Sequence, residues 1–170
     1  PDKIFLTEDL RTLSYAQVEI ATNRLACGFA GLGVGKGGRV VVMMRNGIDM
    51  ALVWLALCKL GAIMVPVNQS YRGAILLHQV NTSDADHAVL HAEFVPQLHE
   101  LRDALSVFRH VVLLDADAGS CVRAGALGEV HGFDSLFDMG ATAPASTVDV
   151  WDPMAIFYTS GTTGPSKGVL

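Results

Sequence analysis

Hydrophobic positions near the start of the chain recur with the spacing of a helix. Ser14 and Gln17 form a capping-box pattern, and four glycines between positions 33 and 38 provide a stop signal. The helix predicted over residues 14–32 has an apolar face made of Tyr15, Val18, Ala21, Leu25, Phe29 and Leu32.

Further along, short apolar runs alternate with longer helical segments. Residues 39–44 form a β-branched run without polar alternation, which predicts a strand covered on both faces. Further strands are predicted at residues 62–67, 87–90 and 111–114. The intervening segments predict helices at residues 48–60, 73–81, 93–105 and 133–139. This alternation favours right-handed crossovers and an α/β fold with a doubly wound, largely parallel sheet.

Two segments interrupt the alternation. Residues 115–132 contain glycine and serine breakers without periodicity, so we expect a loop there. Asp115 and Asp117 in this loop are interpreted as solvated turn residues. Residues 141–150 are rich in small residues and proline, which predicts a weak internal seam within one domain spanning residues 1–170.

One stretch is apolar enough to require a membrane test. Residues 50–67 contain Lys59 as their only charge, and a span of roughly 20 apolar residues crosses a bilayer. Gly61 and Pro66 interrupt the stretch, so a helix followed by a strand explains it better. We therefore expect no integral membrane span.

Composition narrows the class of protein. Hydrophobic residues make up 51% and charged residues 17% of the 170 positions, which indicates a globular chain with ample core. The formal net charge of −5 disfavours nucleic acid as a partner. Cys27, Cys58 and Cys121 include no CxxC pair, so we expect reduced thiols in a cytoplasmic protein.

We find no spacing of residues in the sequence that is typical of a metal site or of a set of catalytic residues. His87 and His91 lie four positions apart, but no HExxH motif surrounds them, and they are interpreted as strand-end histidines. We therefore assign no catalytic residue and no metal ligand. The chain starts at Pro1 and ends in an apolar run without a stop signal, so we expect a piece of a longer protein.

A glycine-rich segment near the carboxyl end is the candidate for a phosphate-binding loop. An apolar strand predicted at residues 155–158 leads into a ten-residue loop at 159–168, and Gly168 is expected to begin another strand. Glycine N–H groups, hydroxyls and Lys167 are the parts of a phosphate cradle. Composition alone fits an ordinary glycine-rich hairpin turn equally well. The hydroxyls belong to Ser160, Thr162, Thr163 and Ser166.

This loop is not the phosphate loop of the Walker NTPases. Aligned on Gly161, Ser166 stands where that motif needs its second glycine, and Gly168 stands where it needs serine or threonine. The Walker loop also caps a helix, whereas a strand is expected to follow here.

The segment YTSGTTGPSKG, residues 158–168, closely resembles the phosphate-binding signature of the adenylate-forming superfamily. That superfamily includes acyl-CoA synthetases, luciferases and nonribosomal peptide adenylation domains. Its common signature has proline immediately before the lysine, whereas here Pro165 precedes Ser166. The resemblance extends upstream through residues 13–15, 38–40, 46 and 61–68. A further pattern is closest to ligases of fatty or carnitine-type acids, and it comprises Tyr71, Arg72, Gly73, Leu77 and His78.

The resemblance implies the incomplete amino-terminal part of the large domain of such an enzyme. The parent protein would be an ATP-dependent ligase that converts a carboxylic acid to acyl-AMP and transfers the acyl group to CoA. The implied cofactors are ATP, Mg²⁺ and CoA, and Lys167 would be a phosphate partner or loop anchor. The cofactor-binding residues implied by the signature are Thr159, Ser160, Gly161, Thr162, Thr163, Gly164, Ser166 and Lys167.

Two other functions stay open at this point. The parent could instead load an amino or aryl acid onto a carrier-protein thiol, or the chain could belong to a noncatalytic nucleotide-binding module. Much of the implied machinery lies beyond Leu170 in the family, so we expect residues 1–170 alone to be inactive.

Overall fold

A five-stranded parallel sheet forms the centre of the protein. The computed structural model describes residues 1–142, 145, 148–159 and 166–170. The strand order is β4-β3-β5-β6-β7, and every pairing in this sheet is parallel. The doubly wound fold predicted from the sequence is confirmed. The strands are β3 (Arg39–Met43), β4 (Ile63–Pro66), β5 (His87–His91), β6 (His110–Leu114) and β7 (Glu129–Gly132).

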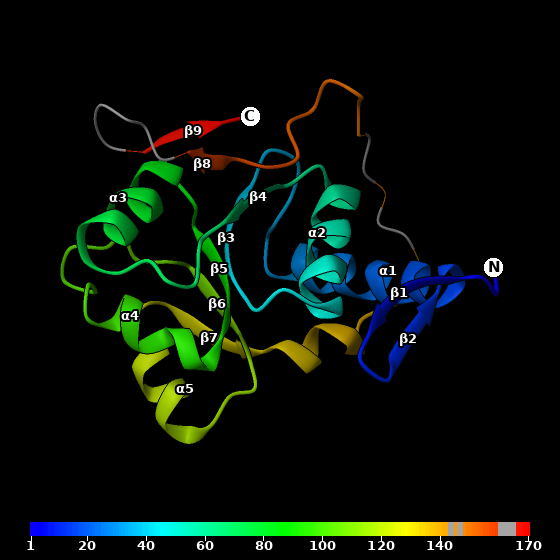
Figure 1. Cartoon of the computed structure of the whole chain (residues 1–170), viewed down its shortest axis with the longest axis horizontal. Coiled ribbons are helices and arrows are strands. Elements are labelled where there is room, and N and C mark those ends of the chain that lie inside the picture. The colour runs from blue at the N-terminus through cyan, green and yellow to red at the C-terminus, as the bar shows by residue number, and fades with distance from the viewer. Residues whose placement is uncertain (143–144, 146–147, 160–165) are drawn as a thin grey trace.

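Helices cover both faces of this sheet (Figure 1). On one face lie α1 (Tyr15–Gly31), α2 (Ile48–Leu60) and the 3₁₀ helix η2 (Phe133–Asp138). On the other lie α3 (Gly73–Ser83), the 3₁₀ helix η1 (Ala92–Phe94), α4 (Val95–His99) and α5 (Ala118–Gly125).

Strand β3 shows why both faces must be covered. Val40 and Val42 pack in the core beneath α1 and α2, whereas Val41 and Met43 pack in the core on the opposite face. All four side chains are buried. Because successive strand residues point to opposite faces, an uninterrupted apolar run requires helices on both sides.

Helix α1 begins as the sequence predicts. The Gln17 amide N–H donates to Ser14 Oγ at 3.3 Å, and the Ser14 amide donates to Gln17 Oε1 at 2.8 Å. The reciprocal bonds satisfy two donors at the helix start. The helix ends at Gly31, and Gly33 follows with a φ of 89°, a conformation that glycine adopts readily.

The first residues form a hairpin that was not predicted from the sequence. Strands β1 (Ile4–Glu8) and β2 (Arg11–Ser14) pair antiparallel. The Ile48 amide donates to Glu8 Oε2 at 2.9 Å, so a distant carboxylate caps α2. A Cβ on Gly47 would come within 2.2 Å of Glu8 Oε1, which explains the glycine at that position.

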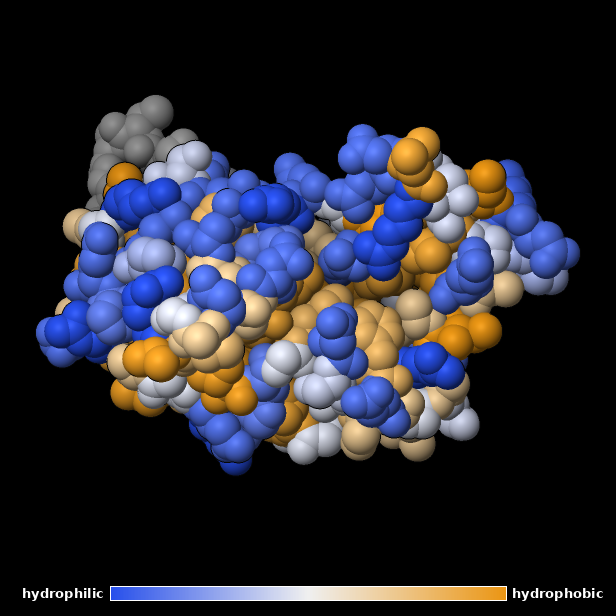
Figure 2. All heavy atoms as spheres, turned by 90° about the horizontal axis from the view of Figure 1, so that it is seen from below, coloured by the Kyte–Doolittle hydropathy of each residue, from blue (hydrophilic) through white to orange (hydrophobic). Residues whose placement is uncertain are grey.

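The apolar stretch at residues 50–67 divides into a helix and a strand. Helix α2 ends before Gly61, whose φ of 65° suits glycine, and β4 starts two residues later. Lys59 Nζ contacts Glu19 Oε1 on α1 at 2.9 Å. Within the described residues, none of the helices has the length and apolar character needed to cross a membrane. Figure 2 shows hydrophilic residues over much of one face of the molecule, with smaller hydrophobic areas between them.

The helix predicted over residues 93–105 is wrong in its extent. Helix α4 ends at His99, and residues 100–105 form turns. Beyond His99 the backbone continues in turns, such as the one closed by the bond from the Arg102 amide to the His99 carbonyl at 3.3 Å. Asn81 on α3 binds the end of this segment, because its Nδ2 donates to the Ala104 carbonyl at 2.9 Å and its Oδ1 accepts from the Ser106 amide at 3.0 Å.

The loop predicted over residues 115–132 is also wrong, because it contains α5 and β7. Asp117 is the cap of α5: the Ser120 amide donates to its carboxylate at 2.6 Å, and the Asp117 amide donates to Ser120 Oγ at 2.9 Å. The hydrogen bond from the Ser120 amide lowers the pKa of Asp117. The capping pattern Asp-x-x-Ser was the signal available in the sequence.

The expected short helix at residues 133–139 is present as η2. The predicted seam at residues 141–150 includes 143–144 and 146–147, which lie outside the described residues, and it stays a prediction.

Substitution of two glycines on α1 tests how closely this helix packs against η2. A Cβ on Gly28 would lie 2.6 Å from Leu136 Cβ and 2.7 Å from the Leu136 carbonyl oxygen, whereas a Cβ on Gly31 would meet only the end of Met139 at 3.3 Å. We expect Gly28→Ala to lower the free energy of unfolding by about 1–3 kcal/mol through overpacking. The matched control Gly31→Ala should be neutral or stabilising. Urea unfolding measures both, and equal effects would contradict the packing.

Candidate functional site

The glycine-rich segment forms a hairpin that continues from one edge of the sheet. Ala155 makes a parallel bridge with Met64 on β4, and the Ile156 amide donates to the Met64 carbonyl at 2.9 Å. Strand β8 (Phe157–Thr159) then pairs antiparallel with β9 (Lys167–Val169). The strand predicted at 155–158 is therefore present, but its regular part begins two residues later.

Three of the eight sequence-predicted phosphate-binding residues lie within the described part of the chain. Thr159 ends β8, Ser166 precedes β9 and Lys167 begins β9. The other five, residues 160–164, lie outside it. The loop is shorter than the predicted 159–168, because both ends of that range belong to the strands.

Thr159 and Lys167 are brought together at the mouth of the hairpin. They are cross-strand partners, and both are exposed. Directly opposite residues of an antiparallel pair project from the same face, so a hydroxyl and a cation share one side of the hairpin.

Helix α3 contacts the hairpin at Tyr158 and Ser166, and it lies beneath β8 and β9 in Figure 1. His78 Nε2 hydrogen-bonds to the Ser166 carbonyl oxygen at 2.9 Å, which requires the ring tautomer with a proton on Nε2. Gln79 Nε2 donates to Ser166 Oγ at 3.4 Å, and Thr82 Oγ1 lies 2.9 Å from Tyr158 Oη. Both strands are thus connected to the body of the fold through one helix.

Gly168 makes the close packing of the hairpin possible. A Cβ at this position would lie 2.8 Å from Ile156 Cγ2 and 3.5 Å from the ring of Tyr158. The last glycine of the segment therefore makes room for the two side chains that face it.

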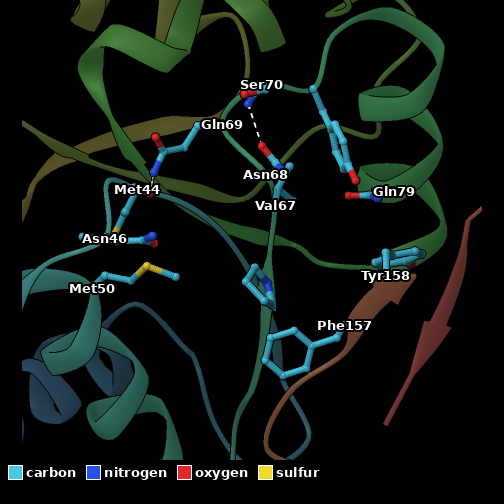
Figure 3. A pocket seen from close by; sticks show the side chains of 12 residues that line it. Met44, Asn46, Met50, Val67, Asn68, Gln69, Ser70, Gln79, Phe157 and Tyr158 are labelled. Atoms are coloured by element: carbon cyan, nitrogen blue, oxygen red, sulfur yellow. Dashed lines mark hydrogen bonds between the residues drawn. The ribbon is translucent and has the colours of Figure 1, made fainter. Parts of the chain in front are cut away.

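A pocket of about 410 Å³ lies beside the hairpin at the carboxyl ends of β3 and β4 (Figure 3). Gln69 Nε2 donates to the Met44 carbonyl at 2.6 Å, and the Ser70 amide donates to Asn68 Oδ1 at 2.9 Å. These bonds order the chain that follows β4. The side chains drawn come from Met44, Asn46, Met50, Pro66, Val67, Asn68, Gln69, Ser70, Tyr71, Gln79, Phe157 and Tyr158.

Sequence reasoning did not identify this pocket as a site. Its amides come from separate elements: Asn46 follows β3, Asn68 and Gln69 follow β4, and Gln79 lies on α3. The available signal was the position of Asn46 and Asn68 just after parallel strands, because ligands of doubly wound sheets bind outside the carboxyl ends of the strands.

Next to the pocket, polar groups gather where the strand order reverses between β3 and β5. The Arg45 amide donates to His91 Nδ1 at 3.2 Å, and the Arg45 side chain forms an ion pair with Glu93. The hydrogen bond from Arg45 lowers the pKa of Glu93. His87 lies at the other end of β5, about 13 Å away along the strand. The two histidines are therefore strand-end residues that are too far apart to share a metal ion.

The doubly wound sheet with its glycine-rich hairpin defines the structural class, and comparison with known proteins defines the family. The chain belongs to the AMP-binding enzyme family, whose pattern it matches over residues 1–170.

The relatives of this chain include CoA ligases. The chain is 34% identical over 170 residues to crotonobetaine/carnitine–CoA ligase of Salmonella agona (strain SL483), covering 95% of this chain and 31% of the relative. It is 29% identical over 160 residues to 4-coumarate–CoA ligase 5 of Oryza sativa subsp. japonica, covering 94% and 27%. The chain thus spans less than a third of the length of either relative.

Solved structures confirm the fold. The anthranilate CoA ligase AuaEII, solved in complex with anthranoyl-AMP, aligns with a TM-score of 0.85 at 24% identity, over 99% of this chain and 31% of that chain. The N-terminal domain of FACL13 from Mycobacterium tuberculosis, solved with an inhibitor, aligns with a TM-score of 0.72 at 29% identity, over 94% and 37%. The fold is that of the amino-terminal part of adenylate-forming enzymes.

The contact between α3 and Ser166 generates a prediction about the hairpin. In the intact protein, His78→Ala should speed amide hydrogen exchange in β8 and β9 by about 2- to 10-fold, because one hydrogen bond contributes about 0.5–1.5 kcal/mol. The control His99→Ala, on α4, should leave these amides unchanged. Unaltered exchange in the His78 variant would show that the His78–Ser166 hydrogen bond does not hold the hairpin.

Proposed function

We propose that the protein containing this chain is an ATP-dependent acid–thiol ligase. A carboxylate is a poor acyl donor, so its oxygen first attacks the α-phosphate of ATP. The acyl–phosphate bond forms as the bond to pyrophosphate breaks. The CoA thiolate then attacks the acyl carbon, and AMP leaves. Membership of the AMP-binding enzyme family and likeness to two CoA ligases support this reaction.

We propose that the loop between β8 and β9 binds the phosphates of ATP. The cofactor-binding set is the one implied by the signature, residues 159–164, 166 and 167. The observation that carries this proposal is the pairing of Thr159 with Lys167 on one face of a hairpin secured to α3. Preorganised donors facing the departing pyrophosphate stabilise charge that develops in the transition state. Lys167 acts there as a cationic hydrogen-bond donor, not as a proton-transfer group.

The donors at the hairpin mouth also suit a phosphate-bound Mg²⁺. Thr159 supplies a hard oxygen ligand next to Lys167, which matches the preference of Mg²⁺ for oxygen and phosphate. When bound, the ion neutralises charge on the phosphates during transfer. The role of Thr159 in this proposal is to orient that complex through its hydroxyl group.

The substrate proposed for the parent is a small organic or fatty carboxylic acid. The named relatives act on carnitine-type acids and on 4-coumarate, all of which carry a carboxylate, so that group defines the substrate class. Residues 1–170 would form part of the AMP-binding large domain, and the cytoplasm is the compartment expected from three cysteines without a CxxC pair.

The main alternative is transfer to a carrier-protein thiol instead of CoA. The adenylation half-reaction is common to both, so identification of the thiol that receives the acyl group distinguishes them. A noncatalytic nucleotide-binding module would bind ATP without exchanging pyrophosphate.

Substitution of Lys167 tests the proposed site. In the intact protein, acid-dependent ATP–pyrophosphate exchange should fall about 10- to 100-fold in Lys167→Ala, because a hydrogen bond to a charged group contributes about 1.5–3 kcal/mol. The melting temperature should change little, since Lys167 is exposed. Lys3→Ala removes another exposed lysine and should keep the parental rate. Absence of exchange in the unmodified protein would exclude the ligase, and parental exchange in the Lys167 variant would remove Lys167 from the site.

A second prediction concerns the chain by itself. Purified residues 1–170 should form no acyl-AMP from ATP and a panel of carboxylic acids, because the hairpin supplies one wall of the proposed site. Chromatographic detection of acyl-AMP provides the measurement, with the intact protein as the positive control. Measurable acyl-AMP formation by residues 1–170 would contradict this division of the site.

A further inference from the structure

Two histidines and a glutamate converge at the amino ends of β6 and β7, away from the proposed nucleotide site. His110 begins β6, Glu129 begins β7 and His131 follows two residues later. One ligand atom from each residue lies within 4.8 Å of the others. His110 Nδ1 lies 2.9 Å from His131 Nε2 and 3.5 Å from Glu129 Oε2, and His131 Nε2 lies 3.8 Å from Glu129 Oε1.

Strand register creates this convergence. His110 is the direct parallel partner of Glu129, and Val112 is the partner of His131. Residues two apart on a strand share a face, so His110, Glu129 and His131 all project toward the face that carries α1. Val112 on that face packs in the core beneath α1 and α2, which confirms the direction.

The surroundings of this cluster are suited to a cation. The side chains of His110 and His131 are 19% and 22% exposed, so they are held within the fold yet accessible. The ring of His87 lies 5.4 Å from that of His110, and His87 Nε2 lies 3.0 Å from the Leu32 carbonyl oxygen after α1. The carboxyl end of a helix carries partial negative charge. Glu129 adds a full negative charge at the exposed side.

We propose that His110, Glu129 and His131 form a binding site for a divalent transition metal of the zinc type. The donors are His110 Nδ1, His131 Nε2 and one carboxylate oxygen of Glu129, with water in a fourth position. Two imidazoles and a carboxylate are a common donor set for Zn²⁺.

The two ring nitrogens lie close to the separation that a zinc ion requires. Zn–N bonds of about 2.0–2.1 Å at a tetrahedral angle place two nitrogens about 3.3 Å apart. The two ring nitrogens, now 2.9 Å apart, therefore need to separate by a few tenths of an ångström. At that distance they share one proton in a hydrogen bond, and the donating ring takes its other tautomer when the ion binds.

Titration of the intact, chelator-treated protein with ZnSO₄ tests the site by calorimetry, with excess Mg²⁺ present. We expect one site that His110→Asn and His131→Asn each weaken by at least about 10- to 100-fold, the loss seen even for groups that only orient a metal ligand. Glu129→Gln should also weaken binding. The control His99→Asn, in α4, should bind as the parent does.

Cobalt spectroscopy of the unsubstituted protein keeps the test independent of variant folding. Added Co²⁺ should give the visible absorption of a tetrahedral nitrogen and oxygen site, and Zn²⁺ should abolish it. Thiolate charge-transfer bands would instead identify cysteine ligands and overturn the assignment. Absence of binding, or parental affinity in both histidine variants, would also overturn it. Because the site lies at the opposite ends of the strands from the pocket, its failure would leave the proposed ligase function intact.

Discussion

The fold depends on burying a parallel sheet from both sides. Residues 40–43 of β3 have at most 1% of their surface exposed, and the side chains alternate between two separate cores. Burial of apolar surface is the dominant favourable term in folding, and β3 presents such surface on both faces. The chain therefore has to place helices on both faces of the sheet, with α1, α2 and η2 on one face and α3, η1, α4 and α5 on the other.

The parallel arrangement of the strands also determines where the pocket and the polar side chains lie. All five strands point the same way, so the segments that follow them gather at one end of the sheet. The pocket beside Tyr158 and the polar group around Arg45 both lie there. The β8–β9 hairpin extends this region from the β4 edge, and its contacts with α3 connect it to the core. The hydrogen-bond donors of a phosphate-binding site must be held in place if they are to be preorganised. The opposite end of the sheet holds the His110, Glu129 and His131 cluster, separated from this region by the length of the strands.

Elements with strong local signals were predicted well, and elements decided by distant contacts were not. The capping box at Ser14 and the apolar run of β3 are local features, and both are present where they were expected. The helix predicted over 93–105 was too long, because the backbone after His99 forms separate turns, whose end Asn81 on α3 binds through Ala104 and Ser106. Strand β7 is short and mostly polar, and it is a strand because β6 supplies its hydrogen-bond partners. Context overrides propensity in such segments.

The sequence by itself determined the α/β class, the order of the main elements and the resemblance that led to the AMP-binding enzyme family. Those conclusions rest on periodicity, capping and a contiguous motif, and each of these features depends on residues that are close together in the sequence. Only the tertiary structure decided that Glu8 caps α2, that His78 meets Ser166 across 88 positions, and that His110 meets His131. These contacts join residues far apart in the chain. Their partners are selected by strand register and helix packing, which exist only once the whole sheet has formed.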